Sequence, residues 1–162
     1  MKPNLAVDVA GVKLRNPVMN AAGVLGLSGS LLKRIAEAGA GAVVTKSIGV
    51  KAREGYVNPT VVEVRCGLLN AMGLPNPGIK EFTDEIKIAK KAGVPVIVSI
   101  YGLTANEFAA AAKEAEKAGA DAVELDVSCP HVKEVGTQIG QDPGELSKVI
   151  RKVKLAVKKR IH

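Results

Sequence analysis

Several chemically capable side chains lie where one predicted strand of this 162-residue chain ends. The apolar run 120–128 includes Asp126 and Ser128 near its end, and Cys129 and His131 follow it. In parallel α/β proteins the carboxyl ends of the strands carry the catalytic groups. A thiol in such a loop can act as a base when its pKa is lowered, although a lone Cys is more often a small buried apolar side chain. We therefore predict that this loop is the centre of a functional site.

The rest of the chain alternates apolar strand-like runs with amphipathic helical patterns. Helix starts are marked by Ser28, by Thr104 with Glu107 three residues later, and by Asp142 ahead of Pro143. A helix is expected after each predicted strand, and the last helix is expected to run to the end of the chain. The predicted strands span 17–23, 40–48, 94–102 and 120–128.

A short repeat supports this organisation. The segments 37–40, 91–94 and 117–120 each contain Ala-Gly and each close a predicted helix just before a strand. A hairpin is predicted over 5–14, around Ala10 and Gly11. Four βα units fall short of the roughly 200 residues or more of a complete (βα)8 barrel. The sequence therefore predicts an α/β fold of TIM-barrel type, as one domain over 1–162: a short N-terminal β-hairpin and a half-barrel of four βα units, with the C-terminal half absent.

Composition argues against nucleic-acid and membrane partners. The formal charge is +7, but Lys and Arg alternate with Glu along the predicted helices, and the aromatic content of 2% leaves little to stack on bases. The N-terminal apolar run is broken by charges, and no stretch approaches the ~20 apolar residues of a membrane span, so we expect a cytoplasmic protein. Neither cysteine has metal-ligand spacing, and Cys66 has no chemical context.

The predicted strand ends bring polar side chains to one face. Gly23, Lys46, Ser99 and Cys129 belong to this set, and the long excursion over 49–78, too apolar for disorder, can fold Asn70 across it. A buried Lys is costly without a partner or a task, and the alternative for Lys46 is a surface lysine. An Asn in a turn-rich loop is more often part of an Asx turn, and Gly23 with its neighbour Ala22 could form an ordinary strand-to-helix turn.

The order of several separated motifs resembles the class 1 dihydroorotate dehydrogenase family. Asp126 stands where that family has Asn, and His131 stands where many members have Asn and the related dihydropyrimidine dehydrogenases have His. The likeness covers essentially the whole chain. The matching motifs are Asn20-Ala-Ala-Gly23, Thr45-Lys46-Ser47, Leu69-Asn70-Ala71-Met72-Gly73-Leu74-Pro75-Asn76-Pro77-Gly78, Ser128-Cys129-Pro130 and Gly140-Gln141-Asp142-Pro143.

This resemblance implies a flavin mononucleotide (FMN) across the barrel mouth, with dihydroorotate as substrate and orotate as product. Lys46 would place a cation beside the flavin ring and the substrate, and Cys129 would remove the substrate's C5 proton. His131 would bind substrate or cap its loop. The implied FMN contacts are Ala22, Gly23, Lys46, Ser47, Ser99 and Asp126; the implied substrate contacts are Lys46, Asn70, Ala71, Met72, Gly73, Leu74, Asp126 and His131.

Three functions remain open at this point. The first is a dihydroorotate dehydrogenase-like flavin oxidoreductase of pyrimidine biosynthesis, inactive as this fragment alone. The second is a dihydropyrimidine dehydrogenase-like flavin domain, which the sequence Cys-Pro-His favours. The third is a catalytically silent half-barrel that acts as an assembly module. Open strand edges predict a homodimer or pairing with a complementary C-terminal half, and we expect FMN to be retained poorly because TIM-barrel phosphate sites commonly use the loops after strands seven and eight.

Overall fold

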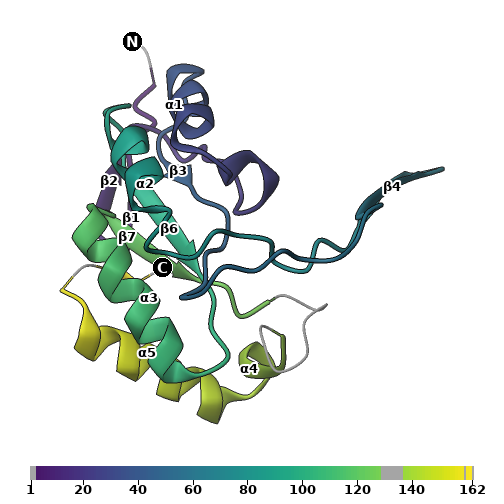
Figure 1. The fold of residues 1–162 in the computed structure, drawn as a ribbon. Helices are drawn as coiled ribbons and strands as arrows, with labels where there is room; N and C mark the ends of the chain where they lie inside the picture. The colour runs from purple at the N-terminus through teal and green to yellow at the C-terminus, as the bar shows by residue number, and fades with distance from the viewer. Residues whose placement is uncertain (1–2, 129–136, 159, 162) are drawn as a thin grey trace.

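A four-stranded parallel sheet forms the centre of the molecule. The computed structural model describes residues 3–128, 137–158 and 160–161. Within these residues the sheet is open and does not close into a barrel (Figure 1). Its outer strands are β3 and β8. The strand order is β3 (Val43–Val44), β6 (Val96–Ile100), β7 (Ala122–Leu125) and β8 (Arg160–Ile161). The parallel βα organisation predicted from the sequence is confirmed.

Helices cover one face of this sheet, and α3 and α5 lie side by side (Figure 1). Three predicted caps are confirmed, because the side-chain oxygens of Ser28, Thr104 and Asp142 accept hydrogen bonds from backbone N–H groups in the first turns of their helices. No helix among the described residues is long and apolar enough to cross a membrane. The helices are η1 (Val24–Gly26), α1 (Gly29–Glu37), α2 (Thr83–Lys90), α3 (Ala105–Ala118), α4 (Thr137–Gln141) and α5 (Pro143–Ala156).

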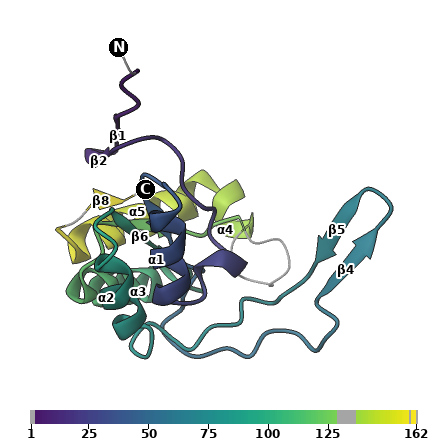
Figure 2. The ribbon, with the colours of Figure 1, turned by 90° about the horizontal axis from the view of Figure 1, so that it is seen from above.

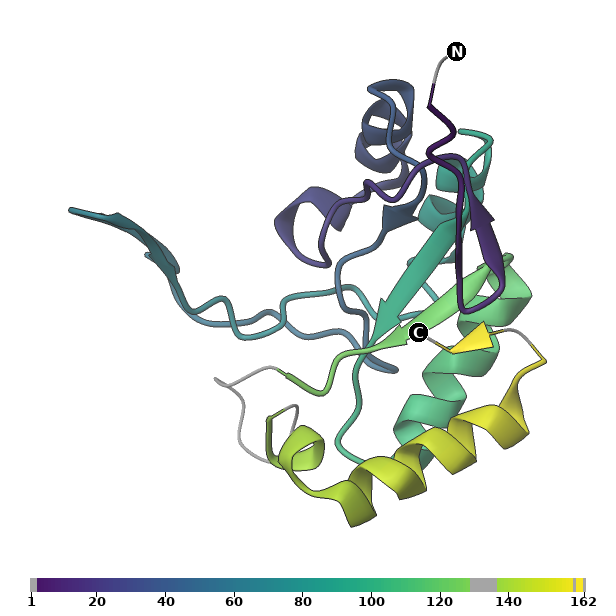
Figure 3. The same cartoon turned by 180° about the vertical axis from the view of Figure 1, so that it is seen from behind.

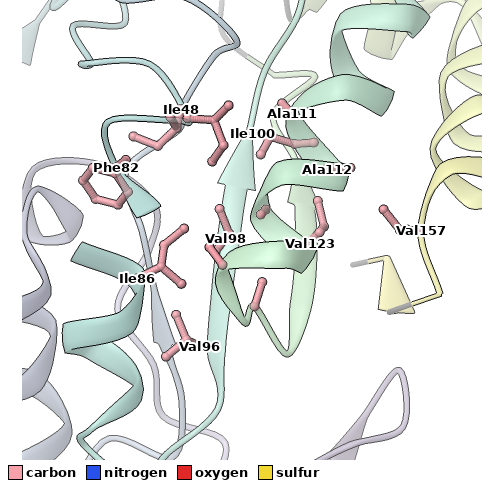
Figure 4. Packing of buried hydrophobic residues seen from close by; sticks show 14 of the residues in the cluster. Ile48, Phe82, Ile86, Val96, Val98, Ile100, Ala111, Ala112, Val123 and Val157 are labelled. Carbon is pink, nitrogen blue, oxygen red and sulfur yellow. The ribbon is translucent and has the colours of Figure 1, made fainter. Parts of the chain in front are cut away.

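The main core lies between the sheet and the helices (Figure 4). Alternate residues of β6, Val96, Val98 and Ile100, are fully buried in this cluster, together with Ile86 of α2 and Phe108 of α3. Because side chains alternate across a strand, Ile97 and Ser99 face the opposite side of the sheet. Each buried Val, Ile or Phe contributes roughly 1.5–3 kcal/mol of apolar transfer free energy. This face therefore supplies most of the stabilisation and leaves the other face for function.

The predicted N-terminal hairpin is confirmed, and it covers the opposite face of the sheet at the amino ends of the strands. It pairs β1 (Val7–Val9) with β2 (Val12–Leu14). Ala10 and Gly11 both have positive φ, at 49° and 76°, which is the geometry of a tight hairpin turn. Its apolar side chains pack with Ile97 and Ala122 in a second cluster. Figure 3 shows the hairpin on this side of the sheet. The hairpin therefore closes the end of this face at which the strands begin.

The excursion over 49–78 is an ordered, two-armed ribbon. Its end is an antiparallel hairpin of β4 (Val61–Val64) and β5 (Gly67–Asn70), which extends away from the sheet (Figure 2). The outbound and return arms are joined by backbone hydrogen bonds at Arg53 and Asn76, 2.8 Å in each direction. The return arm thereby brings residues 70–74 back over the strand ends.

Residues 17–23 do not form the strand predicted there. Asn20 replaces the missing strand ladder with its side chain: Nδ2 donates to the Val44 carbonyl at 2.7 Å, and Oδ1 accepts from the Val44 N–H at 3.0 Å. Only one backbone bond, from Gly41 to the Val18 carbonyl, joins the segment to the chain beside β3. An amide side chain carries both a donor and an acceptor. Asn20 can therefore satisfy the N–H and the carbonyl of Val44 at the edge of β3 without a neighbouring strand.

Two other predicted boundaries were wrong. The second strand, expected over 40–48, is only Val43–Val44 in the structure, because the chain bulges out of the sheet after Val44. The last helix does not continue to the end of the chain. It stops at Ala156, and β8 then pairs in parallel with β7. The run of Lys and Arg near the end obscured this change, because basic residues favour a helix C-terminus.

We expect Asn20→Ala to lower the free energy of unfolding by about 2 kcal/mol, because the buried N–H and carbonyl of Val44 lose their partner. Urea denaturation measures this change. The matched control is Asn4→Ala, where an exposed amide accepts from the exposed Ala6 N–H and the change should stay within about 0.5 kcal/mol. Equal stability of the two variants would contradict the role assigned to Asn20.

Candidate functional site

A cavity of about 550 Å³ lies at the carboxyl ends of the strands. It is mainly apolar with a few polar groups, which is typical of small-molecule sites. Nine of the residues predicted from the sequence are among its lining residues, and they come from four separate segments of the chain. The lining residues are Ala22, Gly23, Val24, Lys46, Ser47, Val61, Leu68, Asn70, Met72, Gly73, Leu74 and Asp126.

Four predicted site residues are not part of this lining. Ser99 is completely buried, and its hydroxyl lies 3.2 Å from that of Ser47, so it reaches the cavity only through Ser47. Ala71 is exposed, and its N–H donates to the Thr60 carbonyl at 2.8 Å. Cys129 and His131 lie outside the residues that the structure describes.

A second cavity, of about 390 Å³, extends the first toward the predicted Cys129 loop. The two cavities share Ala22, Ser47 and Asp126, and the second also includes Glu124 and Ser128. Ser128 is the last described residue before Cys129. The two cavities are therefore adjacent, and together they extend from Lys46 to Ser128.

A β-bulge positions Lys46. Val44 of β3 pairs with Ile97 of β6, and the next pair is Ile48 with Ile100. Between these two pairs the chain after β3 advances four residues, while β6 advances three. The Lys46 N–H lies within this bulge and donates to the Gly26 carbonyl at 2.9 Å. Bulges of this kind redirect side chains beside active sites. Here the bulge places Lys46, only 6% exposed, in the cavity wall.

A buried polar network fills the gap that the bulge leaves in the sheet. The Thr45 hydroxyl accepts from the Ser99 N–H at 3.0 Å and donates to the Lys46 carbonyl at 2.9 Å. Thr45 and Ser99 are both completely buried. Our sequence reasoning overlooked Thr45 as a contributor to the site. The available signal was its polar side chain directly before Lys46 in an otherwise apolar run.

Gly26 allows the short η1 helix to lie directly on the bulge. A Cβ at this position would clash with the backbone of Thr45 and Lys46. No larger residue fits without moving the Lys46 backbone. The segment 22–26 therefore contributes to the site in two ways. Ala22 and Gly23 line the cavity, and Gly26 packs against the Lys46 backbone.

The return arm of the excursion forms the far wall of the cavity. Gly73 and Leu74 both have positive φ, at 72° and 56°. The left-handed region costs a non-glycine residue such as Leu roughly 1–2 kcal/mol, so the surroundings must impose it. Leu74 is 7% exposed. Apolar burial of this side chain offsets part of the backbone cost.

Asp126 gives the cavity a carboxylate. Its N–H donates to the Ile100 carbonyl at 2.8 Å, which continues the β6–β7 pairing beyond the strand end. Its Oδ1 lies 3.3 Å from both the backbone nitrogen and the hydroxyl of Ser128, so it shapes the start of the Cys129 loop. The cavity lining thus combines one cationic side chain, Lys46, with one acidic side chain.

Comparison with known proteins identifies the family of this fold and site. The family model described as dihydroorotate dehydrogenase matches residues 4–161. The chain belongs to the dihydroorotate dehydrogenase family. This result confirms the resemblance drawn from the sequence motifs, and it implies that the open parallel sheet is part of a TIM barrel.

Similar relatives are catalytic subunits of the NAD-dependent B type of dihydroorotate dehydrogenase. The chain is 51% identical to the subunit from Methanocella arvoryzae over 95% of this chain and 50% of the relative. It is 50% identical to the Pyrococcus furiosus subunit, over 93% and 50%, and 49% identical to that of Methanocaldococcus jannaschii, over 95% and 51%. The chain thus spans about half the length of these dihydroorotate dehydrogenases.

We expect Thr45→Val to lower the free energy of unfolding by about 1–3 kcal/mol, because the isosteric change leaves the buried Ser99 N–H without its acceptor. Guanidinium denaturation provides the measurement. Thr83→Val is the control, since the Thr83 hydroxyl donates to the Lys80 carbonyl at an exposed position. A Thr45→Val variant as stable as the control would show that the hydroxyl is not needed in the bulge.

Proposed function

We propose that this chain supplies part of the FMN and dihydroorotate site of an NAD-dependent dihydroorotate dehydrogenase catalytic subunit. The supporting observation is that predicted residues from four separate segments line one cavity at the strand ends. The names of the relatives, all dihydroorotate dehydrogenases, favour this reaction over dihydropyrimidine oxidation. They also favour an enzymatic role over a silent assembly module.

The lining suits a flat heteroaromatic ring such as that of FMN. Gly23 has a φ of 134°, and a Cβ built there would meet no atom within 4 Å, so its backbone borders open space. Ala22 and Met72 offer apolar surface, and Lys46 and Ser47 offer donors. A cation stabilises a ring that becomes negatively charged on reduction. The donor set and the shape of the cavity therefore fit the cofactor that this family uses.

In the proposed reaction, bound FMN would supply the hydride acceptor for C6 of dihydroorotate. Ala22, Gly23 and Ser47 would hold its ring, and Ser99 orients the Ser47 hydroxyl through their hydrogen bond. The Lys46 ammonium group stabilises negative charge on the bound ring and substrate.

The substrate is held between the strand ends and the return arm. Asn70 and the backbone of Met72–Leu74 bind its ring and carboxylate, and Ala71 connects these two contacts. The Cys129 thiolate takes the C5 proton, and His131 lies in the same loop. The thiolate, and not the thiol, is the form of a cysteine that can accept a proton. The resulting double bond between C5 and C6 converts dihydroorotate to orotate.

A complete enzyme needs more than these residues. We propose that the portion of the relatives that this chain does not span completes the barrel and binds the FMN phosphate. The relatives are named as the catalytic subunit of an NAD-dependent enzyme, so a second type of subunit would link the flavin to NAD. A second copy of this chain is the other partner that we propose for the sheet edges.

Cys129→Ser tests the proposed function directly. In the assembled enzyme we expect flavin reduction by dihydroorotate to slow by at least about 100-fold, because a serine hydroxyl ionises far less than a thiol near neutral pH and so offers almost no anionic base. Flavin content, read from the absorbance of the purified protein, should remain unchanged. The control is Cys66→Ser, in the exposed turn of the excursion hairpin. Reduction at the wild-type rate would remove Cys129 from the mechanism.

Asp126→Asn should strengthen orotate binding. A carboxylate close to an anionic ligand repels it by about 1 kcal/mol or more, so we expect orotate affinity to rise about fivefold or more. Titration calorimetry provides the measurement. Asp84→Asn makes the same charge change on α2, outside the cavity, and should leave affinity unaltered. Unchanged or weaker binding to Asp126→Asn would show that the carboxylate does not oppose the ligand.

A further inference from the structure

Hydrogen-bond donors of the excursion bind three consecutive backbone carbonyls of its return arm, next to the cavity. The carbonyls of Met72–Leu74 all accept hydrogen bonds from within the excursion. Two of the donors are side chains, and one is the backbone of the outbound arm. The bonds run from Tyr56 N to Met72 O at 3.1 Å, from Arg53 Nε to Gly73 O at 2.7 Å, and from Asn76 Nδ2 to Leu74 O at 2.9 Å.

These bonds determine the direction of the N–H groups. In a trans peptide the N–H points opposite to the carbonyl of the same peptide group. The carbonyls of Met72 and Gly73 point to the outbound arm, so the N–H groups of Gly73 and Leu74 point away from it. Both residues line the cavity. Two successive N–H groups with fixed directions form a suitable site for a carboxylate.

Asn76 connects this segment to the base of the excursion. Its Oδ1 accepts from the N–H groups of Gly49, at 3.2 Å, and Gly78, at 2.9 Å. Its Nδ2 donates to the Leu74 carbonyl and, at 2.8 Å, to the hydroxyl of Tyr101. One amide side chain therefore uses both donor and acceptor positions to join the two arms to the residue that follows β6.

Tyr101 provides a rigid support for this amide. Its side chain is 7% exposed, and a Cβ at Gly49 would lie 2.7 Å from its Cζ. The ring therefore packs directly against the base of the excursion. The positive φ of Leu74 is a second, independent sign of constraint, because a non-glycine residue keeps this conformation only where its surroundings impose it.

We propose that Arg53, Asn76 and Tyr101 form a positioning latch that sets the backbone of Met72–Leu74 for the substrate carboxylate. The proposal rests on the proposed function, since orotate is its ligand. The latch touches neither substrate nor cofactor and acts through the peptide groups that it holds. It turns a long surface excursion into a preorganised wall of the site.

Amide hydrogen exchange and orotate titration of Tyr101→Phe and Asn76→Ala test the latch. The reporters are the N–H groups of Arg53, Tyr56 and Asn76, which bond across the two arms, and the amides of β6 are the reference. We expect exchange at the reporters to rise about threefold in Tyr101→Phe and about tenfold or more in Asn76→Ala, with β6 unchanged. Orotate affinity should fall by similar factors.

Thr60→Ala is the matched control, because it removes an exposed side-chain bond to Asn58 within the same excursion. It should leave reporter exchange and orotate affinity unchanged. Wild-type exchange at the reporters in Asn76→Ala, or equal acceleration in β6, would overturn the latch. Faster reporter exchange with unaltered orotate affinity would overturn its positioning role. Orotate titrations use the assembled enzyme. If the assembled wild-type enzyme binds no orotate, the proposed function fails, while reporter exchange still decides whether the latch exists.

Discussion

The site depends on the β-bulge between Val44 and Ile48. A strand buried on both faces offers no place for a charged side chain, because an unpaired cation in the core is costly. One extra residue lets the chain leave the ladder and return to it, while Thr45 satisfies the Ser99 N–H in the gap. The sheet thus keeps its hydrogen bonds and still presents Lys46 at the cavity.

The two walls of the cavity differ in how they are held in place by the rest of the protein. Lys46 and Ser47 lie on a sheet packed against the main core, so their positions are rigid. The opposite wall comes from a ribbon whose end extends into solvent (Figure 2). Such a wall needs its own constraints, and the hydrogen bonds centred on Asn76 supply them close to the core.

Lys46 and Asp126 bring one cationic and one acidic side chain to the lining of the same cavity. A nearby carboxylate compensates the charge of a buried ammonium group, but it also opposes an anionic ligand. An amide at position 126 would keep the backbone bond to Ile100 and lose the charge. The residue at position 126 therefore affects both the charge of the cavity lining and the binding of orotate that we propose.

The sequence alone determined the βα order, the N-terminal hairpin and the helix caps, and its resemblance to a known family indicated most of the residues that meet in the cavity. Local rules suffice for the βα order, the hairpin and the caps, because apolar periodicity, capping residues and turn glycines act over a few positions. Only the tertiary structure decided that residues 17–23 form no strand, that β3 ends at Val44 and that Asn76 joins the excursion to Tyr101. In each case a side chain forms a hydrogen bond with a group that is distant in the sequence. The local sequence pattern does not indicate which distant groups will meet.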